Sequence, residues 1–190
     1  MAGKVGQRRR EAVDRTTVVY SAATSLDGFI ADVDGGVDWL HAAMVPGEGY
    51  GLREFMASVD AVLMGSGTYE KSLTMGGGPL MASTTPCWVF SKRKLESVKG
   101  MTVTSADPAE VVAALPGQGI RRAWLMGGGR LASSFLAAGL IDQIVLGVMP
   151  VVLGRGLPLF GGAVPVSTLE LVESKTFKGG ALGLTYRCQR

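Results

Sequence analysis

The sequence predicts an α/β domain of three layers, in which helices cover a mostly parallel β-sheet with an antiparallel C-terminal hairpin. Two observations lead to this prediction. Short apolar runs alternate with helix-like stretches as far as Met149, which is the order expected when helices join parallel strands. Beyond that point, two strand-like segments at 169–177 and 181–188 flank Lys178-Gly179-Gly180, a pattern typical of a β-hairpin.

The first half of the chain begins with a strand. Residues 17–23 are rich in β-branched side chains, which favours a strand, and the pair Asp27-Gly28 marks a turn after it. A long polar loop with several glycines follows, and it is placed to cover a ligand cleft because it starts where the first strand ends. Further along, the sequence predicts a helix over 51–58, a strand over 61–64 and a short helix over 69–73.

Strand and helix also alternate in the second half. Pro108 suits the first turn of a helix because its fixed φ matches the helical value, and Gly139 suits the end of another. A loop with several glycines and prolines is expected over 150–165. The predicted elements before it are strands over 86–90 and 101–104, a helix over 107–115, a strand over 123–126, a helix over 131–138 and a strand over 142–148.

Two glycine-rich turns, Gly65-Ser66-Gly67-Thr68 and Gly127-Gly128-Gly129-Arg130, each follow a buried-strand pattern and each open a helix. Glycine lets the backbone approach a ligand closely, and the first N–H groups of a helix are unpaired and partly positive. The turns therefore predict a cradle for phosphate groups. The alternative is that each glycine only makes a tight connection between strand and helix.

Length and composition favour one domain. The chain has 190 residues, 47% of them hydrophobic, which suffices for one well-buried core and is too few for two ordinary domains. We expect a basic, flexible tail over 1–15 and a single domain over 16–190. No groove-reading motif accompanies the basic tail, so nucleic acid is not an expected partner.

The sequence gives no sign of export, membrane insertion or metal binding. No apolar run is long enough to cross a bilayer, and no signal-peptide pattern opens the chain, so we expect a cytoplasmic protein. Cys87 and Cys188 stand far apart, and His41 is the only histidine. Free thiols and the absence of a metal site are therefore expected.

Several motifs occur together in a fixed order: SLDGFIA at 25–31, VLMGSGTYE at 62–70, VFSK at 89–92, MGGGRL at 126–131, and GLID at 139–142 followed by PVVLGRG at 150–156. In this combination the chain resembles the dihydrofolate reductase-like family over about residues 17–188. Within that family it resembles the branch that includes the reductase domain of the bifunctional riboflavin-synthesis deaminase-reductase. The resemblance implies a dihydrofolate reductase-like fold.

The resemblance also implies a cofactor. Members of this family bind NADPH in an extended form across the carboxyl edge of the sheet, so both glycine turns would hold the pyrophosphate and Ser91 and Lys92 would lie near the adenosine. The cofactor-binding residues implied in this way are Ala23, Gly65, Ser66, Thr68, Ser91, Lys92, Arg93, Met126, Gly127, Gly128, Gly129, Arg130 and Leu131.

One position departs from the family pattern. Many members carry an arginine directly after the first glycine of the turn, where it meets the 2′-phosphate of NADPH, and this chain has Ser66 there. Lys92, Arg93 or Lys94 could supply the cation from a neighbouring loop, because a positive side chain need not come from the same turn. The alternative is a solvated loop of like charges. NADPH is the expected cofactor, with NADH as the alternative.

Asp27 and Glu48 are the candidate proton donors for hydride transfer to a small heterocycle of pyrimidine or pterin type. Asp27 could instead cap the Asp27-Gly28 turn, and Glu48 could instead interact favourably with the dipole of the helix that follows it. The resemblance places the loop 153–156 beside the cleft and near a subunit interface, so a homodimer is expected. A different function remains open, namely a catalytically silent nucleotide-binding sensor or interaction module, in which the same turns bind a cofactor without turnover.

Overall fold

The computed structural model describes residues 15–74, 85–96 and 98–189. The predicted tail, apart from Arg15, lies outside these residues. So does the stretch Met75-Gly76-Gly77-Gly78-Pro79, for which the sequence predicts a flexible connector. The strands are β1 (Thr17–Ser25), β2 (Phe29–Ala31), β3 (Ala61–Gly65), β4 (Cys87–Phe90), β5 (Met101–Thr104), β6 (Arg122–Gly127), β7 (Gln143–Met149), β8 (Leu157–Pro158), β9 (Leu169–Thr176) and β10 (Leu182–Cys188). The α-helices are α2 (Asp38–Ala43), α3 (Leu52–Ala57), α4 (Ser66–Thr74), α5 (Pro108–Ala114) and α6 (Gly129–Ala137).

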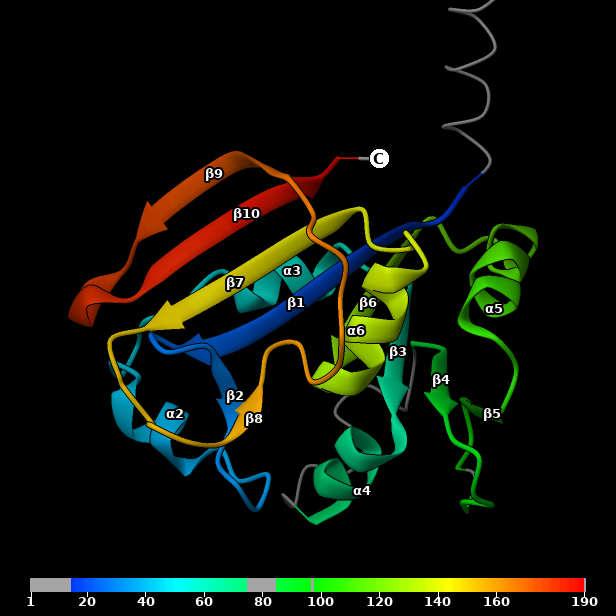
Figure 1. The fold of residues 1–190 in the computed structure, drawn as a ribbon, viewed down its shortest axis with the longest axis horizontal. Helices are drawn as coiled ribbons and strands as arrows, with labels where there is room; N and C mark the ends of the chain where they lie inside the picture. Colours follow the sequence, from blue (N-terminus) through cyan, green and yellow to red (C-terminus); the bar gives the residue numbers. More distant parts are fainter. Residues whose placement is uncertain (1–14, 75–84, 97, 190) are drawn as a thin grey trace, which may run out of the picture.

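Eight of the strands form one twisted sheet in the order β5-β4-β3-β6-β1-β7-β10-β9 (Figure 1). The pairs from β5 to β7 are parallel, whereas β10 pairs antiparallel with both β7 and β9. The mostly parallel sheet and the C-terminal hairpin predicted from the sequence are therefore confirmed. Short 3-10 turns occur at Pro116–Gln118 and, at the hairpin tip, at Lys178–Gly180.

Helices lie on both faces of the sheet, which gives three layers (Figure 1). One face packs against α5 and α6, and its buried core includes Tyr20, Leu63, Leu125 and Phe135. The other face carries α3 and α4, and its core includes Val62 and other side chains that alternate with the first set along the same strands. Alternation along a strand sends neighbouring side chains to opposite faces, so these apolar central strands supply both cores.

Helices α4 and α6 begin earlier than the sequence predicts. The sequence indicated starts at 69 and 131, but the structure begins them at Ser66 and Gly129. Glycine destabilises a helix interior more than a first turn, where backbone N–H groups lack helical partners in any case. The glycine turns are therefore the first turns of the helices themselves.

Two loops contain short elements that the sequence did not reveal. Strand β2 and helix α2 lie in the long polar loop, and β8 lies in the 150–165 loop. β2 and β8 pair antiparallel as a separate two-stranded sheet. A strand of two or three residues is too short to show hydrophobic periodicity, so a loop was the natural prediction for both.

The segment after β8 packs directly on the start of α6. The hydroxyl of Tyr20 donates to the carbonyl oxygen of Leu159 at 2.7 Å, and Gly162 N donates to Ser133 Oγ at 3.0 Å. A Cβ on Gly129 would clash with the Pro158 carbonyl oxygen and would lie 3.0 Å from Gly161 N. Only glycine lets the segment approach this closely.

Among the described residues, no helix is long and apolar enough to cross a membrane. The cytoplasmic location stays a prediction.

We predict that Gly129→Ala destabilises the protein by about 1–3 kcal/mol, because the added methyl group forces the 158–161 segment away from α6. The matched control is Gly67→Ala in α4, where a Cβ meets no atom within 4 Å. This control is expected to change the stability by less than about 0.5 kcal/mol, because Gly67 lies in the first turn of α4 and not in its interior. Urea unfolding measures both effects, and equal stability of the two variants would contradict the packing described.

Candidate functional site

The structure brings the two glycine turns together. β3 and β6 are parallel neighbours, so both turns leave the sheet at its carboxyl edge. A Cβ on Gly65 would lie 3.7 Å from the Gly127 carbonyl oxygen, and one on Gly128 would lie 3.5 Å from Thr68 Oγ1. The backbones of the two turns are thus in near contact, with the Thr68 side chain reaching from one turn to the other.

The starts of α4 and α6 point their first N–H groups to this edge. Gly128 is the N-cap of α6, and no side chain caps that helix start with a hydrogen bond. Gly127 has a φ of 107°, in the region that favours glycine. Uncapped N–H groups at a helix start attract an anion, so the arrangement fits the predicted phosphate cradle.

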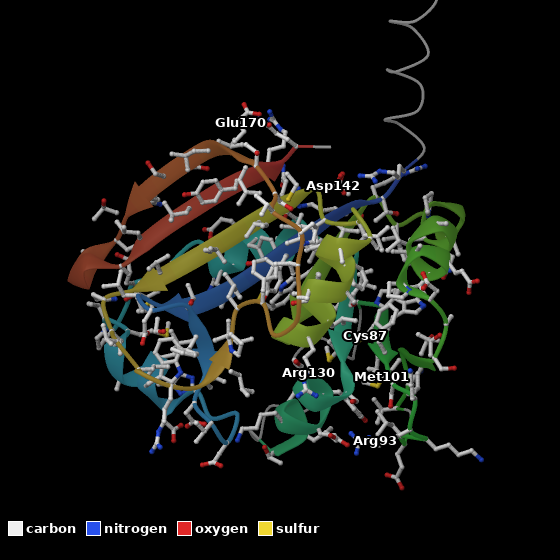
Figure 2. The ribbon with its side chains drawn as sticks, in the orientation of Figure 1. Cys87, Arg93, Met101, Arg130, Asp142 and Glu170 are labelled. Carbon is white, nitrogen blue, oxygen red and sulfur yellow. The ribbon has the colours of Figure 1, made fainter. Side chains whose placement is uncertain are left out.

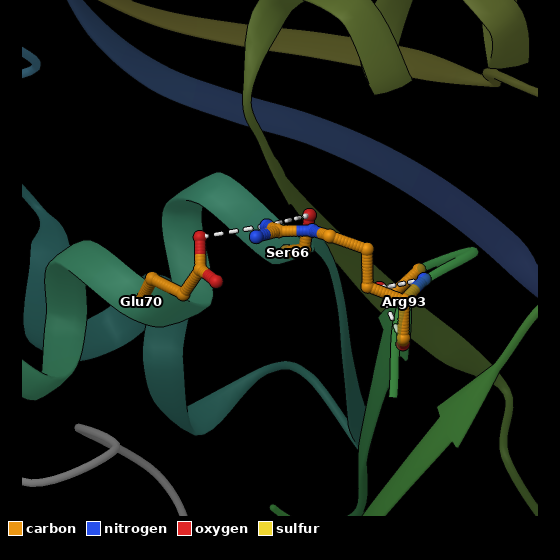
Figure 3. Close-up of polar contacts among 4 residues, drawn as sticks. Ser66, Glu70 and Arg93 are labelled. Atoms are coloured by element: carbon orange, nitrogen blue, oxygen red, sulfur yellow. Dashed lines mark hydrogen bonds and ion pairs between the residues drawn. The ribbon is translucent and has the colours of Figure 1, made fainter. Parts of the chain in front are cut away.

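Arg93 lies at the start of α4, beside the serine that departs from the family pattern (Figure 3). Its guanidinium Nη2 donates to Ser66 Oγ at 3.4 Å and to Glu70 Oε2 at 2.9 Å. Ser66 and Glu70 are four residues apart and share one face of the helix. Of the three cations that the sequence proposed as substitutes, Arg93 is therefore the one that reaches position 66.

Ser91 fixes the turn that presents Arg93. The Ser91 hydroxyl donates to the Arg93 carbonyl oxygen at 2.9 Å, and Arg93 N lies 3.0 Å from Ser91 Oγ. Lys92 and Lys94 are exposed and form no hydrogen bond or ion pair with a described residue. Arg93 and Arg130 come from different elements and lie at the same end of the molecule, away from Asp142 and Glu170 (Figure 2).

A pocket of about 730 Å³ opens on the face of the sheet that carries α3. Its floor consists of small residues on three neighbouring strands, including Ala23 of β1, Gly147 of β7 and Gly183 of β10. Side chains from α2, α3 and the loop between them form its walls, including Leu40, Met44 and Phe55. β1 pairs with β6, so the pocket lies one strand away from the second glycine turn.

The hairpin tip and the α2–α3 loop meet across this pocket. The rings of Tyr50 and Phe177 pack with centroids 5.3 Å apart, and both residues line the pocket. The Tyr50 hydroxyl accepts from Val45 N at 2.8 Å, and the Lys178 N–H lies 3.4 Å from Glu48 Oε2. Tyr50 has a φ of 50°, which is uncommon for a residue other than glycine. The loop thus contacts the hairpin tip through the Tyr50 ring and the Glu48 carboxylate.

The two candidate proton donors lie in different places. Glu48 lines the pocket. Asp27 does not, because its carboxylate accepts from Ser25 Oγ at 2.6 Å and from the backbone N–H groups of Leu153 and Gly154 at 3.1 and 2.7 Å. The Ser25 hydroxyl is the main cause that lowers the pKa of Asp27, and the two N–H groups add to it. The Asp27 carboxylate thus ties its own turn to the distant 153–154 loop.

The remaining predicted residues flank the cradle. Leu131 packs 3.8 Å from the position of a Gly65 Cβ, Met126 packs against the core on the α4 face, and Arg130 is exposed. His41 is exposed on α2. Within the described part of the chain, no group of three or more His, Cys, Asp or Glu side chains is placed to hold a metal ion.

Sequence reasoning missed the contribution of the hairpin to the pocket. Glu173, Lys175 and Phe177 line it, although they lie more than a hundred residues from Glu48 in the chain. Their alternating pattern indicated only a strand. No local signal could have shown that the hairpin meets the α2–α3 loop at this pocket.

We predict that Asp27→Asn lowers the unfolding temperature by a few degrees at pH 7, because the carboxylate that binds the 153–154 loop is lost. The folded pKa of Asp27 lies below its ordinary value of 3.8, so its stabilisation is present above that value and is lost as the pH falls through the folded pKa. The difference from the wild type should shrink between about pH 5 and about pH 2.

Asp34→Asn is the control for this experiment. The Asp34 carboxylate is exposed and accepts no hydrogen bond from a described residue, so this variant should follow the wild type at each pH. Thermal unfolding across the pH series makes the comparison. A constant deficit of Asp27→Asn at all pH values would show that the charge of Asp27 has no part in holding the loop.

Comparison with known proteins identifies the family of this chain. The family model of the RibD C-terminal domain matches residues 72–182. The uncharacterised protein YwjB of Bacillus subtilis (strain 168) is 36% identical over 92% of this chain and 98% of its own length.

Two solved structures share the fold. The crystal structure of the "Putative riboflavin biosynthesis protein" of Shewanella sp. PV-4 is 29% identical, with a TM-score of 0.82 over 92% of this chain and 100% of that one. Dihydrofolate reductase from Enterococcus faecalis, solved with NADP(H), is 16% identical, with a TM-score of 0.67 over 92% of this chain and 97% of that one. The chain therefore belongs to the RibD C-terminal domain family, a reductase domain family, and has the dihydrofolate reductase-like fold.

Proposed function

We propose that this protein is a reductase that uses NADPH to deliver hydride to a small heterocyclic substrate of pyrimidine or pterin type. The observation that carries the proposal is the pair of glycine turns in near contact at the carboxyl edge, with Arg93 beside them. Membership of a reductase domain family supports the reaction type. The riboflavin pathway is the setting we propose, in line with that family.

The cofactor's pyrophosphate lies on the first turns of α4 and α6. The uncapped start of α6 and the glycines of both turns let the two phosphates approach backbone N–H groups. Arg130, at the first turn of α6, adds a positive side chain at the same edge. The enterococcal dihydrofolate reductase of the same fold was solved with NADP(H), which supports this cofactor class.

Arg93 reads the 2′-phosphate that distinguishes NADPH from NADH. In many family members an arginine at the position of Ser66 contacts this phosphate. Here the small side chain of Ser66 leaves room for the Arg93 guanidinium to make that contact. Its present partner, Glu70, is an exposed carboxylate, and the ion pair exposes about half of each side chain. Such exposed pairs are weak, so a doubly charged phosphate can replace the carboxylate.

The substrate occupies the pocket over β1, β7 and β10. Bound NADPH supplies the hydride, and the protein has to hold the substrate against it and provide a proton. Ala23 is on the pocket floor toward the carboxyl end of β1, where nicotinamide and substrate can meet. Glu48 is the proton source that we propose, because it is the candidate donor that lines the pocket.

We further propose that the protein is a homodimer. β9 is exposed along its whole length, and the hairpin presents Leu171 at 53%, Val172 at 47% and Leu182 at 40% exposure. An apolar surface of this kind is typical of a protein–protein contact. Size-exclusion chromatography with light scattering would measure the mass directly, and a monomer at micromolar concentration would contradict this part of the proposal.

NADPH oxidation tests the proposed reaction. Purified protein is mixed with NADPH or NADH and a panel of pyrimidine and pterin substrates. Oxidation of the cofactor is followed as a loss of the absorbance of the reduced nicotinamide ring. Turnover of one substrate supports the proposal. Binding of NADPH without any turnover, unchanged by Glu48→Gln, would instead support a catalytically silent nucleotide sensor. No binding of either cofactor would overturn both.

We predict that Arg93→Ala lowers the affinity for NADPH by about 10- to 100-fold, because a charge-assisted contact with the 2′-phosphate is lost. The affinity for NADH should stay within about twofold, since NADH lacks that phosphate. Lys99→Ala is the control, because Lys99 precedes β5 and therefore lies at the amino ends of the parallel strands, away from the glycine turns at their carboxyl ends. Isothermal titration measures both cofactors. Equal losses for NADPH and NADH would show that Arg93 does not read the phosphate.

A further inference from the structure

A carboxylate is the main partner of Arg93 in the candidate cofactor site (Figure 3). The Arg93 Nη2 donates to Glu70 Oε2 at 2.9 Å, whereas its contact with Ser66 Oγ is longer, at 3.4 Å. A hydrogen bond between two charged groups is also stronger than one from a charged group to a hydroxyl. The cation that we assign to the 2′-phosphate therefore already has an anionic partner within the protein.

Helix α4 fixes the position of Glu70. This residue lies about one helical turn beyond Ser66, on the same face of the helix. The neighbouring residue, Tyr69, is buried, and its hydroxyl donates to the Glu96 carbonyl oxygen at 3.0 Å. This bond ties the helix to the segment after β4. The backbone of Glu70 is therefore held close to Ser66 independently of Arg93.

Both partners of this ion pair have hydrogen-bonding capacity left for a ligand. The Arg93 side chain is 64% exposed and the Glu70 side chain 44% exposed. Among the residues that the structure describes, none accepts from the other guanidinium N–H groups of Arg93, and none donates to Glu70 Oε1. The site thus offers a ligand a cation and, beside it, a carboxylate oxygen.

These two groups favour different cofactors. NADPH carries a 2′-phosphate with about two negative charges, which a guanidinium attracts and a nearby carboxylate repels. NADH carries a hydroxyl in the same place, and a carboxylate accepts a hydrogen bond from a ribose 2′-hydroxyl in other dinucleotide-binding folds. The charge of Arg93 thus favours NADPH, whereas the charge of Glu70 favours NADH.

We propose that Glu70 is a specificity-determining residue that lowers the preference for NADPH and lets the protein bind NADH as well. Arg93 leaves Glu70 and pairs with the phosphate when the ligand is NADPH. When the ligand is NADH, Arg93 stays paired with Glu70, whose other oxygen accepts from the ribose hydroxyl. This inference rests on the proposed function, because it concerns the choice of cofactor in that same site.

The cofactor affinities of Glu70→Gln test the inference. Glutamine keeps the size of the side chain and removes its charge, so NADPH should bind about three- to tenfold more tightly. NADH should bind about two- to fivefold more weakly, because an amide oxygen is a weaker acceptor than a carboxylate. Isothermal titration of the purified protein measures both changes. The gain for NADPH should shrink as salt is added, since screening weakens the repulsion between exposed charges.

Glu170→Gln is the matched control. Glu170 also pairs with an arginine, Arg187, at 2.9 Å, and its side chain is 51% exposed. It lies at the other end of the molecule from Arg93 (Figure 2). This variant removes the same charge from a similar ion pair, and its distance from the site should leave both affinities within about twofold of the wild type.

The double variant Arg93→Ala with Glu70→Gln separates the effect of Glu70 from that of Arg93. Compared with Arg93→Ala alone, it should bind NADPH more tightly and NADH more weakly, because Glu70 acts on both ligands directly. Weaker NADPH binding by the single variant Glu70→Gln would show that Glu70 only holds Arg93 in place, and this result would overturn the inference. An unchanged ratio of the two affinities would overturn it as well. Failure of the wild type to bind either cofactor would overturn the proposed function, a result that is distinct from an altered response of the variants.

Discussion

The parallel pairing of β3 with β6 is the constraint on which the candidate site depends. Because both strands run in the same direction, their following turns leave the sheet at one edge, and the glycines let the two backbones come into near contact. The helices that start there, α4 and α6, direct their first N–H groups to the same edge. Arg93 joins them because β4 is the next parallel strand and ends beside β3. One pattern of strand pairing thus assembles backbone donors and a cation from three distant segments.

The antiparallel C-terminal strands give the other half of the site. β10 continues the sheet past β7, and β9 carries Glu173 and Lys175 to the pocket. The hairpin tip then holds the α2–α3 loop through the ring contact of Tyr50 with Phe177. The pocket is consequently built from a floor of small residues, apolar helical walls and a carboxylate rim. The pocket lies on the same sheet as the cation-bearing carboxyl edge, because β1 pairs with β6.

The elements with strong local signals could be predicted from the sequence, and the long-range contacts could not. The apolar runs before Gly65 and Gly127, which alternate with helix patterns, were enough to predict parallel strands at these positions. From the sequence, residues 92–94 were the candidates for the positive side chain that replaces an arginine at position 66. Only the fold shows that the turn at Ser91 places the Arg93 guanidinium beside Ser66. The bonds of Asp27 to Leu153 and Gly154 join segments over a hundred residues apart, so its turn offered no hint of them. The same distance hid the role of Glu173 in the pocket.

The proposed cofactor site requires the two glycine turns to form one phosphate cradle. Backbone amide chemical shifts, recorded by ¹H–¹⁵N NMR while NADPH is added, test this requirement most directly, since it concerns N–H groups. We expect the largest shifts on Gly65, Thr68 and the amides at the start of α6, with smaller shifts at Arg93. Saturable shifts confined to other segments, or no shifts at all, would show that the turns only connect strands to helices and form no phosphate cradle.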